Sequence, residues 1–451
     1  MVKLQVELGD NAEEILNGTA AGYACAMTPT EEAPSTPNGL SKIVLRLRRS
    51  RLRRFMFLRR TYGRLHRMWS YLSDLFGAIR NADVSAPVLI RDWLPTWFGP
   101  GRLSLLEYCW FNVDRPGLSA QDRAAFVGVR GAAVLEEILS DDYSRILNYD
   151  KLIFDHIARG AGLPVPEIFA VYGPQRRPGP FHKLANVSEL REFLKGWRRF
   201  PIYCKPSFGG NGDQNFQIEG WADERGVIDG DRAVSVEELA ALMTDRAGFG
   251  FLLMETLRPH GDIAAVAGEA VSGLRIQVLR LRKGPTMFRP VWKIARRGAV
   301  VDNYQHGKSG NLFASIDVST GRIERVIYGY GHRQRVNVPH PDTGRQLTGF
   351  QLPHWQAIRE MVEGEAPELF PGWLCQAWDV AICPNGPVLI EVNHFTSMDL
   401  LQHPYGRGFL EGDVLELLRE RNLEPLLRGG AARSRENRNG RFGRRKAHWP
   451  Y

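Results

Sequence analysis

The segment Ala377-Trp-Asp-Val-Ala-Ile-Cys-Pro-Asn-Gly-Pro-Val-Leu-Ile-Glu-Val-Asn393 contains two short apolar runs on either side of a turn. Proline, asparagine and glycine in its middle favour a tight reversal, so we expect the segment to fold as a β-hairpin. This hairpin brings Asp379, in the first strand, close to Glu391, in the second. Because side chains alternate between the two faces of a strand, Glu391 and Asn393 share one face.

Three oxygen-bearing side chains that converge in this way suit a hard cation. Asp379, Glu391 and Asn393 offer two carboxylates and an amide oxygen, which are suitable ligands for Mg²⁺ or Mn²⁺. The remaining coordination positions would be left to water and phosphate oxygens. The alternative is that each acid is held in an ion pair, because an unpaired acid within an apolar strand is costly.

A lysine and several glycines follow an earlier run that is typical of a strand. The run Pro201-Ile-Tyr-Cys-Lys205 leads directly into Pro206-Ser-Phe-Gly-Gly-Asn-Gly212. Glycines allow backbone N–H groups to approach phosphate oxygens, and the lysine adds a positive charge. The stretch is not a P-loop, because the lysine precedes the glycines and no Gly-Lys-Ser/Thr follows them here. A plain glycine-containing hairpin is the alternative.

Two further features are less specific by themselves. Asp150-Lys151 opens a helix that we expect over residues 151–160, and Leu252-Leu-Met-Glu-Thr-Leu257 is typical of a strand that ends in a charged residue. A lysine in a first helical turn is most often a solvated surface residue. The second stretch is also compatible with an edge strand that runs into a loop.

In this order and at these separations, the four features resemble the ATP-grasp superfamily, and the resemblance covers approximately residues 148–417. It implies an α+β fold in which two lobes clamp ATP between them. The twelve-residue step from Asp379 to Glu391 and the pattern Glu391-x-Asn393 are its most specific parts. The strands and helices expected after residue 150, with antiparallel hairpins in place of strict β-α-β alternation, independently favour an α+β architecture.

The resemblance also implies a role for each motif. The phosphates of ATP are expected to contact Lys151 and Lys205, beneath a loop that contains Gly209, Gly210 and Gly212. The adenine is expected to be read by the backbone of a hinge made of Glu255, Thr256 and Leu257. The magnesium ion is expected to be held by Asp379, Glu391 and Asn393.

A narrower resemblance is to ATP-grasp proteins associated with sugar transfer and polysaccharide gene clusters, which are also described as related to α-L-glutamate ligases. Four stretches carry this resemblance: Leu103-Ser-Leu-Leu-Glu-Tyr108, Val301-Asp-Asn303 followed by Gly307, Ile316-Asp-Val-Ser-Thr-Gly321, and Leu352-Pro-His-Trp355. The chain departs from that family at Lys308, where a second glycine is usual.

Cations in the middle of the clamp region fit the same resemblance. Arg275 lies among apolar residues in Leu274-Arg-Ile-Gln-Val-Leu279, and Lys293 and Arg297 follow in the next hairpin. We expect these three residues to be catalytic, because cations there would offset the charge that develops on a transferred phosphoryl group or bind the substrate acid. The alternative for Arg297 and its neighbour Arg296 is an ordinary surface position.

The function implied by the resemblance is an ATP-dependent ligase that forms ADP. Such an enzyme phosphorylates a small-molecule carboxylic acid, and an amine or another nucleophile then displaces the phosphate. Two alternatives remain open: a kinase on the same fold that phosphorylates a sugar-like hydroxyl, and a nucleotide-binding module without chemistry at a membrane-associated polysaccharide assembly. The residues identify neither the acid nor the nucleophile.

The positive charge of the chain is concentrated near its two ends. Residues 42–67 contain eleven lysines and arginines and no acid, and residues 428–451 contain eight against one acid, whereas the whole chain carries only +9. The basic segment 42–67 also contains Phe55, Phe57 and Leu58. We expect it to contact an anionic membrane surface, with a helix packed on the clamp as the alternative and nucleic acid disfavoured.

These observations divide the chain into four parts. We expect residues 1–40 to be poorly ordered, 41–147 to form a helical and basic N-terminal extension, 148–427 to form the ATP-grasp domain and 428–451 to form a disordered tail. Within the extension, the sequence predicts an irregular connection over 81–102 and helices near 103–109 and 120–139. The chain shows no signal peptide or apolar run of about 20 residues, so we expect a cytoplasmic protein, peripheral to the membrane if the basic segment contacts it.

Overall fold

The computed structural model describes residues 75–77, 79–80, 84–140, 149–173, 179–209, 214–228, 230, 232–244, 249–298, 309–329 and 334–429. All of them belong to one compact unit that begins at Leu72. The predictions for residues 1–40 and for the basic segment 42–67 lie outside the described residues. So do those for Gly210, Gly212, the stretch 301–308 and nearly all of the C-terminal tail.

The described N-terminal part is helical. It consists of α3 (Ala86–Phe98), α4 (Leu105–Trp110), α5 (Ala120–Ala124) and α6 (Val129–Leu139). Ser119 caps α5, because its side chain accepts from the backbone N–H of Asp122 and the Asp122 side chain accepts from the backbone N–H of Ser119.

Two predictions for this part are wrong. Residues 81–102 contain the helix α3, in which Pro87 lies in the first turn, where a proline needs no hydrogen-bond partner, and Pro95 near the C-terminal end. Residues 120–139 form two helices, because Gly128 interrupts them and caps α6. A Cβ atom at Gly128 would lie 2.5 Å from the carboxylate of Glu107, which accepts from the backbone N–H of Val129.

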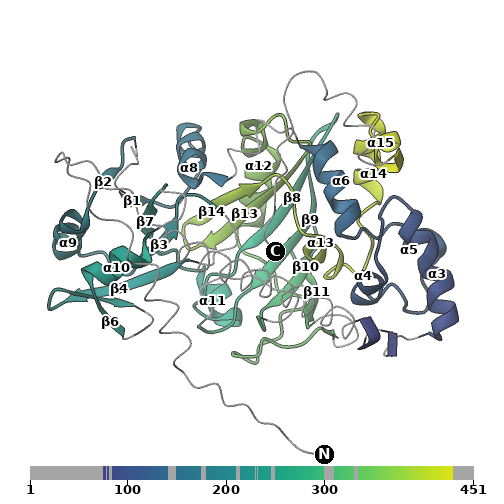
Figure 1. Cartoon of the computed structure of the whole chain (residues 1–451), viewed down its shortest axis with the longest axis horizontal. Coiled ribbons are helices and arrows are strands. Elements are labelled where there is room, and N and C mark those ends of the chain that lie inside the picture. Colours follow the sequence, from purple (N-terminus) through teal and green to yellow (C-terminus); the bar gives the residue numbers. More distant parts are fainter. Residues whose placement is uncertain are drawn as a thin grey trace, which may run out of the picture. The chain divides into compact units, whose positions relative to one another are not determined.

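The strands of the first of two sheets follow α8 (Lys151–Gly160) in the chain. Its strands are β1 (Ile168–Tyr172), β2 (His182–Leu184), β3 (Ile202–Pro206), β4 (Phe216–Ala222), β5 (Arg225–Ile228), β6 (Arg232–Ser235) and β7 (Phe251–Glu255), in the order β2-β1-β7-β3-β4-β5-β6. All neighbours are antiparallel except β1 and β2. The helices α9 (Val187–Gly196) and α10 (Val236–Leu242) share a hydrophobic core with this sheet (Figure 1).

The second sheet carries the hairpin quoted from the sequence. Its strands are β8 (Leu274–Leu281), β9 (Gly284–Ile294), β10 (Leu312–Ile316), β11 (Ile323–Tyr328), β12 (Arg335–Val336), β13 (Cys375–Cys383) and β14 (Gly386–Asn393), in the order β12-β11-β10-β9-β8-β13-β14. The mixture of helices and mostly antiparallel strands confirms the α+β class (Figure 1). The antiparallel pairing of β13 with β14 confirms the predicted hairpin.

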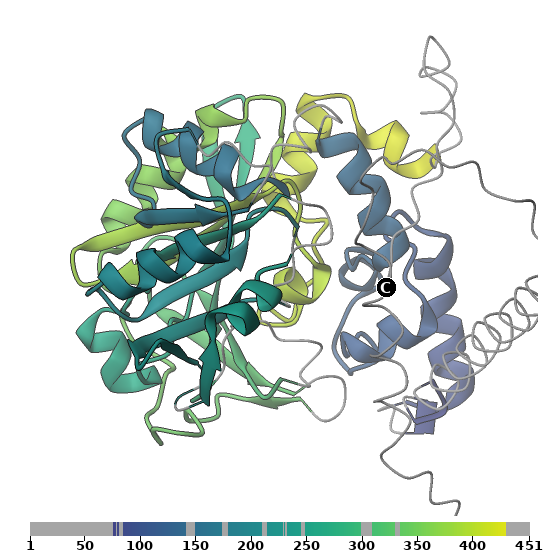
Figure 2. The ribbon, with the colours of Figure 1, turned by 60° about the vertical axis from the view of Figure 1, so that its left-hand side comes forward.

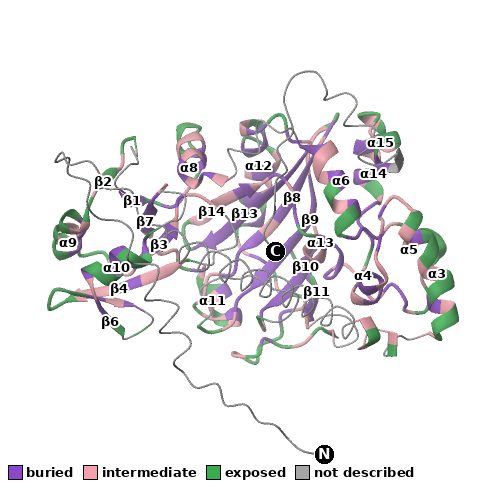
Figure 3. Cartoon of the chain, in the orientation of Figure 1, coloured by how far each residue is buried: buried purple, intermediate pink, exposed green. Residues whose placement is uncertain are grey.

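The two faces of the second sheet pack against different helices. On β8, Ile276 and Val278 join the core formed with α8, α11 (Gly261–Ala267) and α12 (Trp355–Glu363), whereas Leu279 and Leu281 join the core of the opposite face. That second core contains α3, α4 and α6 together with α13 (Met398–Gln402), α14 (Gly412–Glu420) and α15 (Glu424–Gly429). Figure 2 shows these helices beside the sheets, and Figure 3 shows that the central strands are the most completely buried part. Among the helices that the structure describes, none is long and apolar enough to cross a lipid bilayer.

A buried arginine fixes the chain after α13 to the second sheet. Arg289, on β9, is 3% exposed, and it donates hydrogen bonds to the carbonyl oxygens of Leu401, Arg407 and Gly408. It also forms an ion pair with Glu411 at 2.5 Å. Arg289 therefore anchors the loop between α13 and α14 to β9, while Arg115, Arg325 and Tyr405 hold it at other points.

Replacement of Arg289 with alanine should destabilise the protein by roughly 3 kcal/mol, because Glu411 and three carbonyl groups lose their partner. Urea denaturation followed by circular dichroism measures this loss. The control is Arg345→Ala, at an exposed position, which should change the free energy of unfolding by no more than about 0.5 kcal/mol. Equal effects of the two substitutions would contradict the structural role of Arg289.

Candidate functional site

The predicted metal ligands are brought together by β13 and β14. Asp379 is the cross-strand neighbour of Glu391, and the amide of Asn393 donates to the carboxylate of Glu391 at 3.3 Å. The pairing shifts between Asp379 and Val380, which makes Ile390 the extra residue of a β-bulge. The bulge allows Leu389 and Val392 to join the same core while Glu391 remains beside Asp379.

Asp379 is the most strongly compensated acid of the site. It is 4% exposed, and both of its oxygens accept hydrogen bonds from the guanidinium group of Arg275, one of them at 2.8 Å. The ammonium group of Lys293 lies 3.5 Å from the second oxygen. Burial alone would raise the pKa of Asp379, but the charges of Arg275 and Lys293 and the hydrogen bonds from Arg275 lower it to about 2.

The negative charge of Glu391 is compensated much less directly. Among the described residues it forms no ion pair within 4 Å, although the charges of Lys151 and Lys205 act on it from farther away. Two carboxylates opposite one another on neighbouring strands repel. A further cation at Glu391 and Asn393 would relieve this repulsion.

Two lysines of the first sheet and its adjoining helix face these acids. Lys205 is the penultimate residue of β3 and is 6% exposed, yet its ammonium group donates no hydrogen bond to another described residue. Burial, and then the neighbouring charge of Lys151, lower the pKa of Lys205 to about 8. Burial also lowers the pKa of Lys151. Both lysines are therefore held close together in an environment that favours an added anion.

Local pairing at the start of α8 positions Lys151. Asp150 caps α8 by accepting from the backbone N–H groups of Leu152 and Ile153, and it forms an isolated β-bridge with Phe208. The side chain of Lys151 donates to the carbonyl oxygen of Gly209. Gly209 has a φ of 109°, which favours glycine. The start of α8 and the beginning of the glycine-rich loop thus form one unit.

The predicted adenine hinge joins the two sheets. Glu255 ends β7 and accepts from the backbone N–H of Glu167 at 2.9 Å, while the Thr256 hydroxyl donates to the Pro201 carbonyl. The backbone of Leu257 takes part in no hydrogen bond with another described residue. A few residues later, the N–H of His260 donates to the carbonyl of Ile382, on β13.

The structure does not bring every predicted residue into this site. Arg297 lies on an exposed turn after β9, where its backbone N–H donates to Asp342, and no contact between its side chain and the acids is found among the described residues. Its neighbour Arg296 is paired with Asp342 at 2.9 Å. The alternative of a surface position therefore describes Arg296 and Arg297 better, and a catalytic role for Arg297 stays a prediction.

The site also contains supporting residues that the sequence motifs did not predict. His394, directly after Asn393, is 8% exposed, and its ring nitrogen lies 2.8 Å from the carboxylate of Glu136, on α6. The hydroxyl of Thr396 lies 3.4 Å from Arg275. A histidine next to the Glu-x-Asn pattern was the available signal, but its partner lies 258 positions away in the chain.

The donor set fits a magnesium or manganese ion. It consists of two carboxylates and one amide oxygen, which are the hard ligands that such ions prefer. Asp379 is already bound on both oxygens, so Glu391 and Asn393 offer the more accessible positions. No group of three histidine, cysteine, aspartate or glutamate side chains is arranged as a metal site in the part of the chain that the structure describes.

Replacement of Arg275 with alanine should cost roughly 3–5 kcal/mol of stability, because it leaves Asp379 buried with its best partner removed. Since the pKa of Asp379 is about 2 in the folded chain and usually 3.8, its contribution is complete above about pH 4 and is lost as the pH falls toward 2. The substitution should therefore also flatten the acid limb of the stability curve, measured by urea denaturation at several pH values.

The matched control is Arg280→Ala, on the same strand. Arg280, whose side chain is 18% exposed, pairs at 2.9 Å with Glu368, whose side chain is 59% exposed, and also donates to the carbonyl oxygen of Pro367. Its loss should cost about 1–2 kcal/mol, less than the loss of Arg275. A similar loss of stability for both variants would contradict the special role of the Arg275–Asp379 pair.

Several solved structures are similar to parts of the chain at low sequence identity. Carboxyaminoimidazole ribonucleotide synthase from Aspergillus clavatus is 11% identical, with a TM-score of 0.34 over 57% of this chain and 48% of that one. Its counterpart from Thermotoga maritima is 13% identical, with a TM-score of 0.30 over 60% and 52%. D-alanyl-alanine synthetase A from Vibrio cholerae is 12% identical, with a TM-score of 0.37 over 62% and 66%.

The chain thus spans about half the length of the first two of these structures. Likeness at this level supports no conclusion about the fold or the reaction. No curated protein sequence matches the chain.

The sequence itself gives a more specific match. The family described as sugar-transfer associated ATP-grasp matches residues 138–415, a range that contains both sheets and every site residue predicted from the sequence. This range is more than half of the 451 residues. The match confirms the resemblance inferred from the motifs, and the chain belongs to the sugar-transfer associated ATP-grasp family.

Proposed function

We propose that the protein is an ADP-forming ligase that activates a carboxylic acid with ATP for attack by an amine or another nucleophile. The observation that carries this proposal is the buried charge cluster between the two sheets. Four cations, Arg275, Lys293, Lys151 and Lys205, surround the two carboxylates Asp379 and Glu391. Within this set the positive charges outnumber the negative ones, which suits a polyphosphate, and Asp150 and Asp155 also act on the two lysines.

The two lysines are the proposed ligands of the phosphate chain. Lys205 is buried and has a depressed pKa, so an anion beside it would be stabilised more strongly than at the protein surface. Lys151 reaches the first residue of the glycine-rich loop, Gly209, and would couple phosphate binding to closure of that loop. The unpaired backbone of Leu257 offers hydrogen bonds to the adenine.

The acids and the remaining cations have complementary proposed roles. Glu391, Asn393 and Asp379 would hold Mg²⁺ or Mn²⁺, which when bound neutralises part of the phosphate charge. Arg275 and Lys293 are anchored by Asp379. They are therefore held in place to stabilise the negative charge of the transferred phosphoryl group without reorganisation.

The proposed reaction has two steps. An oxygen of the substrate carboxylate attacks the terminal phosphorus of ATP, the bond to ADP breaks, and an acyl phosphate forms. The nitrogen of an amine then attacks the acyl carbon, inorganic phosphate leaves, and the nitrogen loses a proton. Exclusion of water protects the acyl phosphate from hydrolysis.

The proposed substrates are a small-molecule acid and a small-molecule nucleophile. The description of the family as sugar-transfer associated supports a place in polysaccharide or cell-surface biosynthesis. Contact of residues 42–67 with an anionic membrane surface would place the enzyme at the cytoplasmic face of the membrane.

The reaction type is tested by incubating the protein with ATP, a panel of acids and hydroxylamine, which converts an acyl phosphate to a hydroxamate. A ligase gives ADP and hydroxamate in equal amounts. A kinase gives ADP and a stable phosphoester without hydroxamate, and a binding module gives neither product.

Replacement of Glu391 with glutamine should leave the protein folded but reduce ATP turnover by about a hundredfold or more, because charge stabilisation of the transferred phosphoryl group is lost. Turnover is followed by release of ADP in the presence of magnesium, and folding by circular dichroism. The control is Glu360→Gln, at an exposed position of α12, which should retain wild-type turnover. Turnover within twofold of wild type for Glu391→Gln would refute the metal assignment.

Replacement of Lys205 with methionine should weaken ATP binding at pH 7 by roughly 1–3 kcal/mol, the contribution of a charge-assisted hydrogen bond. Since the pKa of Lys205 is about 8 in the free protein, its charge is present below that pH and is lost as the pH rises above it. Wild-type affinity should therefore fall between pH 7 and 9.5, whereas Lys205→Arg should retain its affinity over this range.

Calorimetric titration with ATP measures both effects. The control is Lys195→Met, which removes a 58% exposed lysine paired with Glu224 and should leave ATP affinity unchanged. Wild-type affinity that does not depend on pH, or equal affinity for wild type and Lys205→Met, would count against the placement of the phosphates at Lys205.

A further inference from the structure

The helix α3 presents apolar side chains on two opposite faces. Leu89 and Thr96 are buried against the rest of the helical part, and the indole N–H of Trp93 donates to the carbonyl oxygen of Leu103. On the other face Ile90, Leu94 and Phe98 follow one another at intervals of four residues, and they are 43%, 45% and 78% exposed. Side chains at this spacing form one continuous stripe along a helix.

A stripe of this kind requires an explanation. Single exposed apolar residues are common, but a helix that is apolar on both faces is normally covered on both. The only acid of α3, Asp92, lies outside the stripe and is paired with Arg91 and Arg123. Something apolar is therefore expected to cover Ile90, Leu94 and Phe98.

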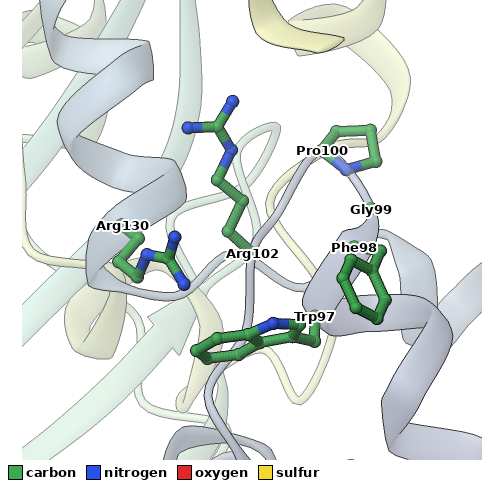
Figure 4. A pocket seen from close by; sticks show the side chains of 6 residues that line it. All are labelled: Trp97, Phe98, Gly99, Pro100, Arg102 and Arg130. Atoms are coloured by element: carbon green, nitrogen blue, oxygen red, sulfur yellow. The ribbon is translucent and has the colours of Figure 1, made fainter. Parts of the chain in front are cut away.

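A cationic hollow adjoins the C-terminal end of the stripe (Figure 4). It has a volume of about 620 Å³, and the described residues that line it are Trp97, Phe98, Gly99, Pro100, Arg102 and Arg130, none of which is acidic. The guanidinium group of Arg130 lies 4.6 Å from the centre of the Trp97 ring. The side chain of Arg102 donates no hydrogen bond within the described part of the chain.

The backbone around the hollow is rigidly placed. A Cβ atom at Gly101 would lie 1.9 Å from the carbonyl oxygen of Phe126, so only glycine permits this contact between the loop after α3 and the chain before α6. The backbone N–H of Gly128 donates to the carbonyl oxygen of Gly101 at 2.9 Å. The two arginines are thus held on neighbouring elements beside the stripe.

The charge of this surface disfavours two of the possible covering partners. The segment 42–67 of the same chain carries eleven lysines and arginines and no acid, so it would be repelled by Arg102 and Arg130. A second copy of the same surface would place like charges opposite each other. A lipid bilayer with anionic headgroups offers an apolar layer for the stripe and phosphates for the arginines.

We propose that α3 and the adjoining hollow form a docking surface for an anionic lipid bilayer. Ile90, Leu94 and Phe98 enter the boundary between headgroups and acyl chains, and Arg102 and Arg130 bind headgroup phosphates through charge-assisted hydrogen bonds. Trp97 lies between them, at the depth that tryptophan prefers. The helix lies in the plane of the surface, because its thirteen residues are too few to cross the bilayer.

The test uses the full-length protein and sedimentation with vesicles of phosphatidylcholine, with and without phosphatidylglycerol. Phe98→Glu, in the exposed stripe, should weaken binding to phosphatidylglycerol vesicles roughly tenfold, because its burial in the boundary is lost. The double variant Arg102→Gln/Arg130→Gln should weaken binding to a similar extent. Both variants should retain wild-type ATP turnover and melting temperature.

Two control variants introduce the same kinds of substitution on other surfaces of the protein. Leu242→Glu, at a 39% exposed position of α10, and Arg345→Gln, at an exposed loop position, should bind vesicles like wild type. Because residues 42–67 also carry positive charge, the comparison is always between full-length variants that retain this segment.

Three results would overturn the proposal. The first is unchanged vesicle binding by Phe98→Glu or by the arginine double variant. The second is a lower melting temperature of Phe98→Glu with unchanged binding, which would mean that the chain itself covers the stripe. The third is a wild-type dimer in lipid-free solution that Phe98→Glu dissociates, which would identify a second copy as the partner.

Discussion

The ion pair between Asp379 and Arg275 connects the fold of this protein to its candidate site. Asp379 lies on β13, a strand that is buried along its whole length, where an uncompensated charge would be very unfavourable. Arg275 occupies the directly opposite position on β8, and Lys293 on β9 completes the compensation. All three side chains therefore have to lie on the same face of the second sheet. The opposite face is left to the apolar core with α8, α11 and α12.

The same constraint explains the β-bulge in β14. In a regular strand Leu389 and Glu391 would point to the same face, and one of them would be badly placed. The extra residue Ile390 allows Leu389 to reach the core while Glu391 stays beside Asp379. One insertion thus reconciles an apolar core with a site for a cation.

Backbone pairing between separate segments keeps the two sheets in register around the charges. The N–H of Leu389 donates to the carbonyl of Pro164, and that of His260 donates to the carbonyl of Ile382. The N–H of Gly209 donates to Tyr149, at the start of α8. These contacts hold Lys151 and Lys205 opposite the acids even though the two lysines repel each other. An anionic ligand between the sheets would relieve that repulsion. The placement of the two lysines in the free protein therefore favours the binding of an anion.

Much of the fold and of the site could be predicted from local patterns, because hairpins, helix caps and glycine turns depend on neighbouring residues. The β13–β14 hairpin, the cap of α8 at Asp150 and the pairing of Asp379 with Glu391 all follow from short stretches of sequence, and so does membership of the ATP-grasp superfamily. The local sequence does not predict the helix α3, because its two prolines disfavour a helix. In the folded chain, burial of Leu89 and Thr96 stabilises this helix. The bulge at Ile390, the Arg275–Asp379 pair and the contact between His394 and Glu136 depend on residues far apart in the sequence. Only the tertiary structure decides which of the cations meet the acids, because the free energy of a buried charge is set by what surrounds it in space and not by its neighbours along the chain.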